Sequence, residues 1–161
     1  MSLAIRAARP ADGALIFSLV RELAEYEKLS AEVEATQEWV AAVLFGDTPR
    51  LFCEIGMWDG EAVGFSTWFL NYSTFRGSVG VFIEDLFVRP AYRGRGVGKG
   101  LMASLARRCI QEGYGRCEWA VLGWNTPSIA FYKSIGAQLR EDWRLCRLSG
   151  AALKNFAQAA P

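Results

Sequence analysis

A glycine-rich segment with interleaved basic side chains is the part of this chain whose residue types most clearly predict chemistry. It follows an apolar run that ends at Pro90, and it consists of Arg93-Gly94-Arg95-Gly96-Val97-Gly98-Lys99. Alternate glycines let the backbone curl so that several N–H groups face one point, and a helical pattern follows at once. A helix N-terminus adds positive potential, and the three basic side chains add mobile charge. The segment therefore predicts a site for the phosphate or pyrophosphate of a small molecule.

Two common phosphate-binding motifs do not fit this segment. A P-loop requires a glycine five residues before the Gly-Lys pair and a Ser or Thr after it, whereas Arg93 and Gly100 occupy these positions. The dinucleotide-binding pattern can be matched only by Gly98, Gly100 and Ala103, which already lie in the predicted helix. Too little chain follows them for a doubly wound fold. A surface turn with solvated arginines remains as the alternative, and the dense mixture of glycine and basic residues disfavours it.

With its neighbours, the segment resembles the acetyl-CoA pyrophosphate loop of the GNAT N-acetyltransferases. Residues 83–88 before it resemble the splayed central strand of that family, and residues 124–137 resemble the family's Asn…Phe-Tyr…Gly-Ala segment. Residues 21–27 and 143–145 are similar to the diamine (spermidine/spermine) acetyltransferase subgroup, which includes members that acetylate thialysine. The similarity covers nearly the whole chain.

This resemblance implies an α/β GNAT fold, in which helices flank a mixed, mostly antiparallel sheet with a splayed central strand. It also implies a homodimer that uses acetyl-CoA and acetylates a small primary amine, namely a diamine, a polyamine or a lysine analogue, by direct attack. Gly123 departs from the subgroup, where an acidic residue is expected, so the substrate is less constrained than the reaction. Acetylation of an antibiotic amine or a protein N-terminus, and a non-catalytic acyl-CoA-binding sensor, are the alternatives.

Acetyl transfer from a thioester to an amine needs a neutral amine, a stabilised oxyanion and a proton for the departing thiolate. Because a primary amine has a pKa near ~10, it must first lose a proton. Glu84, just before the glycine-rich segment, is the candidate base, and the resemblance implies that it acts through ordered water. Tyr132 is the candidate acid, because a phenol keeps its proton at neutral pH and can donate it to a thiolate. The chain has no histidine for either role.

The remaining site residues follow from the resemblance. It assigns the substrate amine to Asp85 together with Tyr26 and Glu27. A regular strand would turn Glu84 and Asp85 to opposite faces, so both can reach one cleft only through a bulge. Beyond the glycine-rich segment, contacts to acetyl-CoA are expected from the backbone of three strand residues, Leu86, Phe87 and Val88. Asn125 is expected to cap the helix that follows it or to bond the pantetheine arm, and the two roles can coexist.

Composition agrees with one compact domain, residues 1–161. Apolar residues make up 52% of the chain and the net charge is +1, which favours neither nucleic acid nor an anionic membrane as a partner. Cys53, Cys109, Cys117 and Cys146 show no C-x-x-C spacing. We therefore expect no metal site, and reduced thiols in a cytoplasmic protein.

The elements that must position these residues are expected in a mixed order. A hairpin is predicted around Asp59-Gly60, and residues 71–80 are predicted to form a polar connection that covers a cleft. Strands are expected at 3–7, 51–57, 62–70, 81–88, 117–122 and 144–148. Helices are expected from Pro10, at 36–45, 101–112 and 125–135, with one helical turn in the tail.

Overall fold

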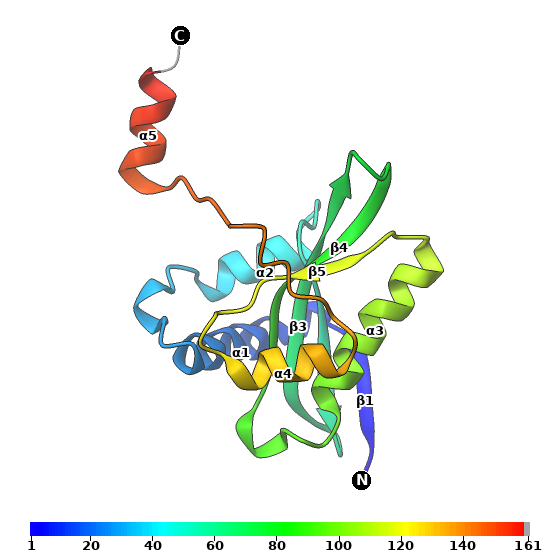
Figure 1. Ribbon diagram of the computed structural model, residues 1–161. Coiled ribbons are helices and arrows are strands. Elements are labelled where there is room, and N and C mark those ends of the chain that lie inside the picture. Colours follow the sequence, from blue (N-terminus) through cyan, green and yellow to red (C-terminus); the bar gives the residue numbers. More distant parts are fainter. Residues whose placement is uncertain (160–161) are drawn as a thin grey trace. The chain divides into compact units, whose positions relative to one another are not determined.

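The computed structural model describes residues 1–159, and the chain divides after Ala120 into two compact units, each described by itself. The first unit is built on a five-stranded sheet in the order β1-β2-β3-β4-β5 (Figure 1). The strands are β1 (Leu3–Ala7), β2 (Phe52–Trp58), β3 (Glu61–Ser73), β4 (Ser78–Val88) and β5 (Cys117–Trp119). The first four are antiparallel and β5 runs parallel to β4. The predicted mixed, mostly antiparallel sheet is therefore confirmed.

Three helices belong to the first unit: α1 (Gly13–Tyr26), α2 (Gln37–Phe45) and α3 (Val97–Glu112). Single 3-10 turns lie at Pro10–Asp12, Ser30–Glu32 and Pro90–Tyr92. The second unit contains α4 (Thr126–Ser134) and α5 (Gly150–Ala159). Among the residues that the structure describes, no helix combines the length and the hydropathy needed to cross a membrane.

Local signals in the sequence explain where these elements begin and turn. Thr36 caps α2 by accepting a hydrogen bond from the Trp39 amide at 3.3 Å. Asp59 and Gly60 both adopt positive φ angles, +46° and +84°, in the tight turn between β2 and β3. This backbone matches the twist of a two-residue hairpin, so the predicted Asp-Gly turn is confirmed.

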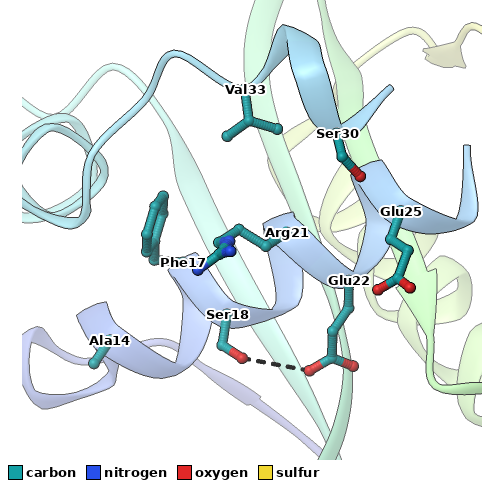
Figure 2. A pocket seen from close by; sticks show the side chains of 8 residues that line it. All are labelled: Ala14, Phe17, Ser18, Arg21, Glu22, Glu25, Ser30 and Val33. Atoms are coloured by element: carbon teal, nitrogen blue, oxygen red, sulfur yellow. Dashed lines mark hydrogen bonds between the residues drawn. The ribbon is translucent and has the colours of Figure 1, made fainter. Parts of the chain in front are cut away.

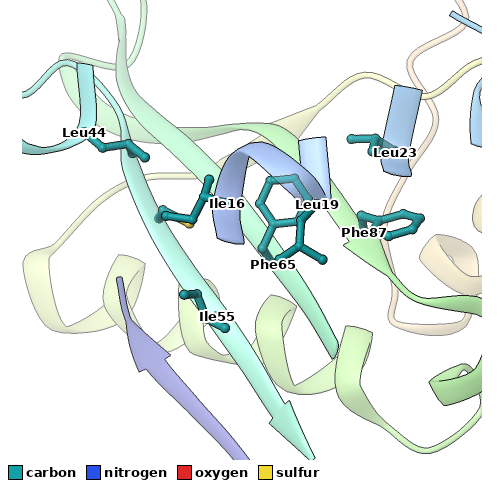
Figure 3. Packing of buried hydrophobic residues seen from close by; sticks show 8 residues of the cluster. Ile16, Leu19, Leu23, Leu44, Ile55, Phe65 and Phe87 are labelled. Atoms are coloured by element: carbon teal, nitrogen blue, oxygen red, sulfur yellow. The ribbon is translucent and has the colours of Figure 1, made fainter. Parts of the chain in front are cut away.

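Two apolar clusters hold the sheet of the first unit between its helices. One lies between the sheet and α1 with α2, where Phe65 is fully buried (Figure 3). Its other members come from the two helices, from β2 and from the end of β4, namely Ile16, Leu19, Leu23, Leu44, Cys53, Ile55 and Phe87. The other cluster joins Val63 of β3 to Val97 and Leu101 of α3. Helices therefore cover both faces, and the end of β4 contributes to both clusters through alternate side chains.

Several predicted boundaries were wrong. Residues 71–80 do not form a covering connection, because Tyr72 pairs with Val79 and Ser73 with Ser78, which leaves a tight turn. The helix expected at 101–112 begins earlier, at Val97, directly after Gly96. The strand at 117–122 ends at Trp119. Within the described residues, 144–148 form no strand, and the tail forms the ten-residue helix α5 instead of one turn.

Candidate functional site

A β-bulge lies in β4 at the predicted acidic pair. Thr67 of β3 pairs with Asp85, but the next residue, Trp68, pairs with Ile83, so Glu84 is an extra residue without a partner in β3. Cross-strand partners share a face of the sheet, so Ile83 lies on the face of Trp68 and Asp85 on the opposite face. The bulge interrupts the alternation of a regular strand, so the pairing no longer holds Glu84 to the face opposite Asp85.

Asp85 lies on the face of the sheet that α1 covers, two residues before the buried Phe87. It is half-buried, and the hydroxyl of Thr67 donates a hydrogen bond to its Oδ2. Burial raises the pKa of Asp85, the hydrogen bond from Thr67 opposes this rise, and the nearby Glu84 charge adds to it. Glu84 itself is exposed.

The end of α1 supplies a second carboxyl group to this place. Tyr26 is the last residue of α1, and Glu27 caps the helix with its amide bonded to the Leu23 carbonyl oxygen at 2.9 Å. Burial raises the pKa of Glu27, and the charge of Asp85 raises it further, so the two carboxyl groups lie within electrostatic reach of each other. The Tyr26 ring lies 6.4 Å from the ring of Phe87. The structure thus brings Tyr26, Glu27 and Asp85 together.

Thr67 is a member of this group that the sequence did not predict. It is 1% exposed on a strand whose other side chains are mostly apolar. Its contact to Asp85 depends on the pairing register of β3 and β4, which the bulge shifts by one residue. No local pattern in the sequence predicts such a register.

The glycine-rich segment forms an open loop before α3. Gly94 and Gly96 have φ angles of +75° and +87°, and no heavy atom lies within 4 Å of where a Cβ would stand on either. The first hydrogen bond of α3 runs from the Gly100 amide to the Gly96 carbonyl oxygen at 2.8 Å. The amides of residues 97–99 therefore precede the helical ladder, and Lys99 is exposed beside them. Such a helix end suits an anion.

The two arginines of this loop lie on different aromatic groups. The Cζ atom of Arg93 is 4.3 Å from the centroid of the Tyr26 ring. The Cζ atom of Arg95 instead lies 5.6 Å from the centroid of the Trp58 ring and 5.3 Å from that of the Tyr92 ring. Arg93 therefore contacts the residue predicted for the amine site, and Arg95 does not.

The second half of β4 separates from β5. The two strands pair only at Val81, Phe82 and Ile83, and β5 ends at Trp119. Within the described residues, the β5-side edge of β4 beyond Ile83 has no strand partner, while its other edge stays paired with β3 as far as Val88. This is the splayed central strand expected from the sequence. Its free edge carries backbone groups that an extended ligand can pair with, as an added strand would.

The second unit carries the other two predicted site residues on one short helix. Asn125 is the N-cap of α4, where its side-chain oxygen accepts a hydrogen bond from the Ser128 amide at 3.4 Å. Tyr132 lies in the last turns of α4, with its ring 5.4 Å from that of Phe131. The capping role predicted for Asn125 is confirmed.

A hollow of about 380 Å³ lies along the outer side of α1, and none of the predicted site residues line it. Figure 2 shows Arg21 and Glu25 of α1 near Ser30 and Val33 of the following loop. The other lining residues are Ala14, Phe17, Ser18 and Glu22. Both signs of charge occur in the lining, so it favours neither an anion nor a cation.

Comparisons with known proteins agree on one family. A model described as the acetyltransferase (GNAT) family matches residues 14–137. The thialysine N-epsilon-acetyltransferase of Bos taurus is 37% identical over 164 residues, which cover 95% of this chain and 96% of that protein. The L-ornithine N5-acetyltransferase of Arabidopsis thaliana is 31% identical over 195 residues, or 93% of this chain and 86% of that protein. The solved structure of an integron cassette protein from the V. cholerae mobile metagenome has a TM-score of 0.81 at 26% identity, and covers 99% of both chains.

Proposed function

The chain belongs to the GNAT acetyltransferase family, and from that membership we propose that it transfers the acetyl group of acetyl-CoA to a small primary amine. The proposed substrate class is a diamine, a polyamine or a lysine analogue. The observation that carries this choice is the pair of half-buried carboxyl groups, Glu27 and Asp85, that lie within electrostatic reach of each other. A cationic amine is the ligand that such a pair favours. The relatives that act on thialysine and on ornithine support the same class.

The loop before α3 fits the pyrophosphate of acetyl-CoA. Gly94 and Gly96 leave open space beside the backbone, and the first amides of α3 supply donors at the positive end of the helix. Exposed Arg95 and Lys99 supply positive charge. We assign the extended pantetheine arm to the unpaired edge of β4 at residues 86–88, with Asn125 as a further contact.

We assign the transfer steps to two residues. Glu84, exposed at the bulge, accepts a proton from the ammonium group through water, which frees the nitrogen lone pair. The nitrogen attacks the thioester carbonyl, so that a C–N bond forms and the C–S bond breaks without an acetyl-enzyme. A backbone N–H near Phe87 or Val88 stabilises the oxyanion. Tyr132 donates its proton to the departing thiolate. The attacking nitrogen releases its second proton to water as the amide forms, and the phenolate regains a proton from solvent.

Selection of the amine rests on the residues around the bulge. Glu27 and Asp85 attract the cationic groups of the substrate, and Tyr26 lies beside Glu27 at the end of α1. A diamine or a lysine analogue carries a second polar group away from the reacting nitrogen. One carboxylate therefore holds that group while the other lies near the nitrogen that reacts.

We further propose a homodimer that works in the cytoplasm. Trp39, Tyr72 and Phe75 of the first unit are large and exposed, with Phe75 fully exposed, and a second copy of the chain would cover such groups. All four cysteines are free thiols, which suits a reducing compartment. Sedimentation equilibrium tests the dimer, and a single monomeric species would exclude it.

Release of free thiol from acetyl-CoA, measured against a panel of amines, tests the proposed function. The panel holds putrescine, spermidine, lysine, thialysine, ornithine, an aminoglycoside and a short peptide. We expect release with one or more of the first five and none without an amine. Release with the aminoglycoside or the peptide alone would contradict the proposed substrate class. Binding of acetyl-CoA without release for any amine would contradict the transferase assignment.

A further inference from the structure

Arg89, which directly follows β4, and Arg93, the first residue of the glycine-rich segment, contact α1 one helical turn apart. Arg89 donates from Nε and Nη2 to the two carboxylate oxygens of Glu22 at 2.9 and 2.7 Å. Its Nη1 donates to the Ala62 carbonyl oxygen at 2.9 Å. Four residues further along each segment, Arg93 lies over Tyr26. Residues four apart on a helix are neighbours, so Glu22 and Tyr26 form one edge of α1 that contacts the loop.

Arg93 occupies a defined position between β4 and α1. Its Nε donates a hydrogen bond to the Val88 carbonyl oxygen at 2.9 Å, which fixes the guanidinium beside the end of β4. The same guanidinium covers the Tyr26 ring, with 4.3 Å between Cζ and the centroid, and lies 5.8 Å from the Phe87 centroid. A cation over the face of a tyrosine is attracted by the ring, and the hydrogen bond sets its orientation.

These contacts form a continuous connection between the two halves of the site. Arg93 is joined through one peptide bond to Gly94, whose positive φ shapes the loop that we assign to pyrophosphate. Its side chain lies on Tyr26, which directly precedes Glu27. Arg95 has the same charge and lies in the same loop, but its rings, Trp58 and Tyr92, are outside α1.

We propose that Arg93 is a positioning residue that couples the cofactor loop to the amine site through Tyr26, in place of the phosphate contact expected from the sequence. The proposal rests on the proposed function, because it takes the loop to hold acetyl-CoA and Glu27 to hold the amine. With acetyl-CoA in the loop, Arg93 keeps Tyr26, and with it the end of α1, in the arrangement that receives the amine. By thermodynamic linkage, each ligand then raises the affinity for the other by the same factor.

Arg93→Gln and Arg95→Gln are a matched pair that separates the two roles. In R93Q the new amide side chain retains a donor for the Val88 carbonyl and loses the cation over Tyr26. We expect R93Q to raise the amine KM about threefold to tenfold, the range of an exposed to partly buried cation–π contact. Its Kd for CoA without amine should stay within about twofold of the natural protein. We expect R95Q to raise that Kd about fivefold or more and to leave the amine KM at saturating acetyl-CoA within about twofold.

Tyr26 provides the second arm of the experiment. Tyr26→Phe keeps the ring, so R93Q in that background should raise the amine KM as it does in the natural protein. Tyr26→Leu removes the ring, so adding R93Q to it should change the amine KM by less than about twofold. Arg93→Lys keeps the cation and should restore most of the lost affinity. A change in Tm common to all variants would not produce this pattern.

Three results would overturn the coupling. One is an unchanged amine KM in R93Q while the natural protein transfers acetyl groups. Another is a loss of CoA affinity without amine that equals the loss in R95Q, which would assign Arg93 to the phosphate. The third is an equal R93Q effect in the Y26F and Y26L backgrounds. If the natural protein transfers to no amine, the proposed function fails and the coupling falls with it, which is a different outcome from these three.

Discussion

Three carboxyl groups, those of Glu27, Asp85 and Glu84, lie near the end of α1 and the bulge in β4, and they differ in burial. Glu84 is exposed, whereas burial raises the pKa of Asp85 and of Glu27. The charge of Glu84 raises the pKa of Asp85 further, and the charge of Asp85 does the same to Glu27, because like charges repel. An incoming ammonium group relieves both the burial cost and the repulsion. We therefore expect the site to favour a cation before any shape complementarity is considered.

The raised pKa of Asp85 predicts how stability depends on pH. Folding favours the protonated acid, so its contribution is fully present below the unfolded-state pKa of 3.8 and is lost as pH rises through the higher folded-state pKa. Asp85→Asn keeps the shape and an acceptor for Thr67 but cannot ionise. We expect D85N to have a Tm a few degrees higher than the natural protein at about pH 8, and the difference to vanish toward about pH 4.

Thermal unfolding of both proteins across this pH range checks the expectation. D85N should also raise the amine KM about tenfold or more, because one of the two carboxylates is lost. Thr67→Val is the matched control for stability. It should lower the Tm at about pH 8, because it removes a hydrogen bond that opposes the rise in the pKa of Asp85. A D85N protein less stable than the natural one at about pH 8 would contradict a raised pKa for Asp85 in the folded protein.

Tyr132 is the residue whose proposed role is tested by removing a single oxygen atom. Tyr132→Phe keeps the ring beside Phe131 and removes the proton that we assign to the thiolate. General acid catalysis contributes about a hundredfold or more, so kcat should fall by that factor while the Kd for CoA changes little. Thiol release at saturating substrates and CoA titration measure the two quantities. An unchanged kcat would show that the thiolate takes its proton from another donor.

At the scale of elements, the sequence predicted whatever a short segment determines by itself. Asp59-Gly60 gives the hairpin turn because its backbone angles suit few other pairs, and Asn125 caps α4 because its side chain reaches the Ser128 amide. The glycines before α3 predicted the loop in the same way, because Gly94 and Gly96 adopt positive φ angles that suit few other residues. The start of α3 at Val97 was missed because Gly98 and Gly100 are poor helix formers, and packing of Val97 and Leu101 outweighs that cost.

Features that depend on pairing between distant segments could not be predicted. The bulge at Glu84 was recognised only as a condition for Glu84 and Asp85 to act together, and the register of β3 against β4 fulfils that condition. The same pairing extends β3 to Ser73 and begins β4 at Ser78, beyond the ends expected for both strands. The strand expected at 144–148 needs a partner strand to supply its hydrogen bonds, and the second unit forms no strand within the described residues.

The loop conformation predicts a difference between two glycines with nearly equal backbone angles. Gly96 (φ +87°) and Gly60 (φ +84°) both have open space where a Cβ would stand. Alanine at either position adopts the left-handed region at a cost of about 1–2 kcal/mol in the free energy of unfolding. Only Gly96→Ala places a methyl group in the loop assigned to pyrophosphate. We expect G96A to raise the Kd for CoA about tenfold and G60A to leave it within about twofold.

Denaturant unfolding and CoA titration of the two variants separate strain from binding. Equal losses of stability with unequal losses of affinity support the assignment. If G60A weakens CoA binding as much as G96A does, the effect comes from general destabilisation, and the loop loses its support as the phosphate site.

At the scale of the first unit, the sheet separates two apolar clusters, and the candidate site lies at the place where β4 serves both. Phe87 is buried in the cluster under α1, while Leu86 and Val88 pack partly against the cluster under α3. The same four residues from 85 to 88 therefore link a carboxyl group, two cores and a strand edge that is free of β5. Binding at that edge is expected to stabilise the fold as a whole, because local opening of β4 disturbs both clusters.

Binding of CoA alone is therefore expected to raise the Tm, without any acetyl transfer. A ligand present at about a hundredfold excess over its Kd stabilises the native state by about 2.7 kcal/mol. For a chain of 161 residues, this corresponds to a rise in Tm of roughly 5–10 °C. Calorimetry with CoA should show this rise for the natural protein and a smaller one for G96A at the same CoA concentration, because its Kd is higher. Pantetheine, which lacks the pyrophosphate, is the matched control and should give a shift of less than about 2 °C at that concentration. Equal shifts with CoA and pantetheine would place the binding energy on the strand edge and not on the loop before α3.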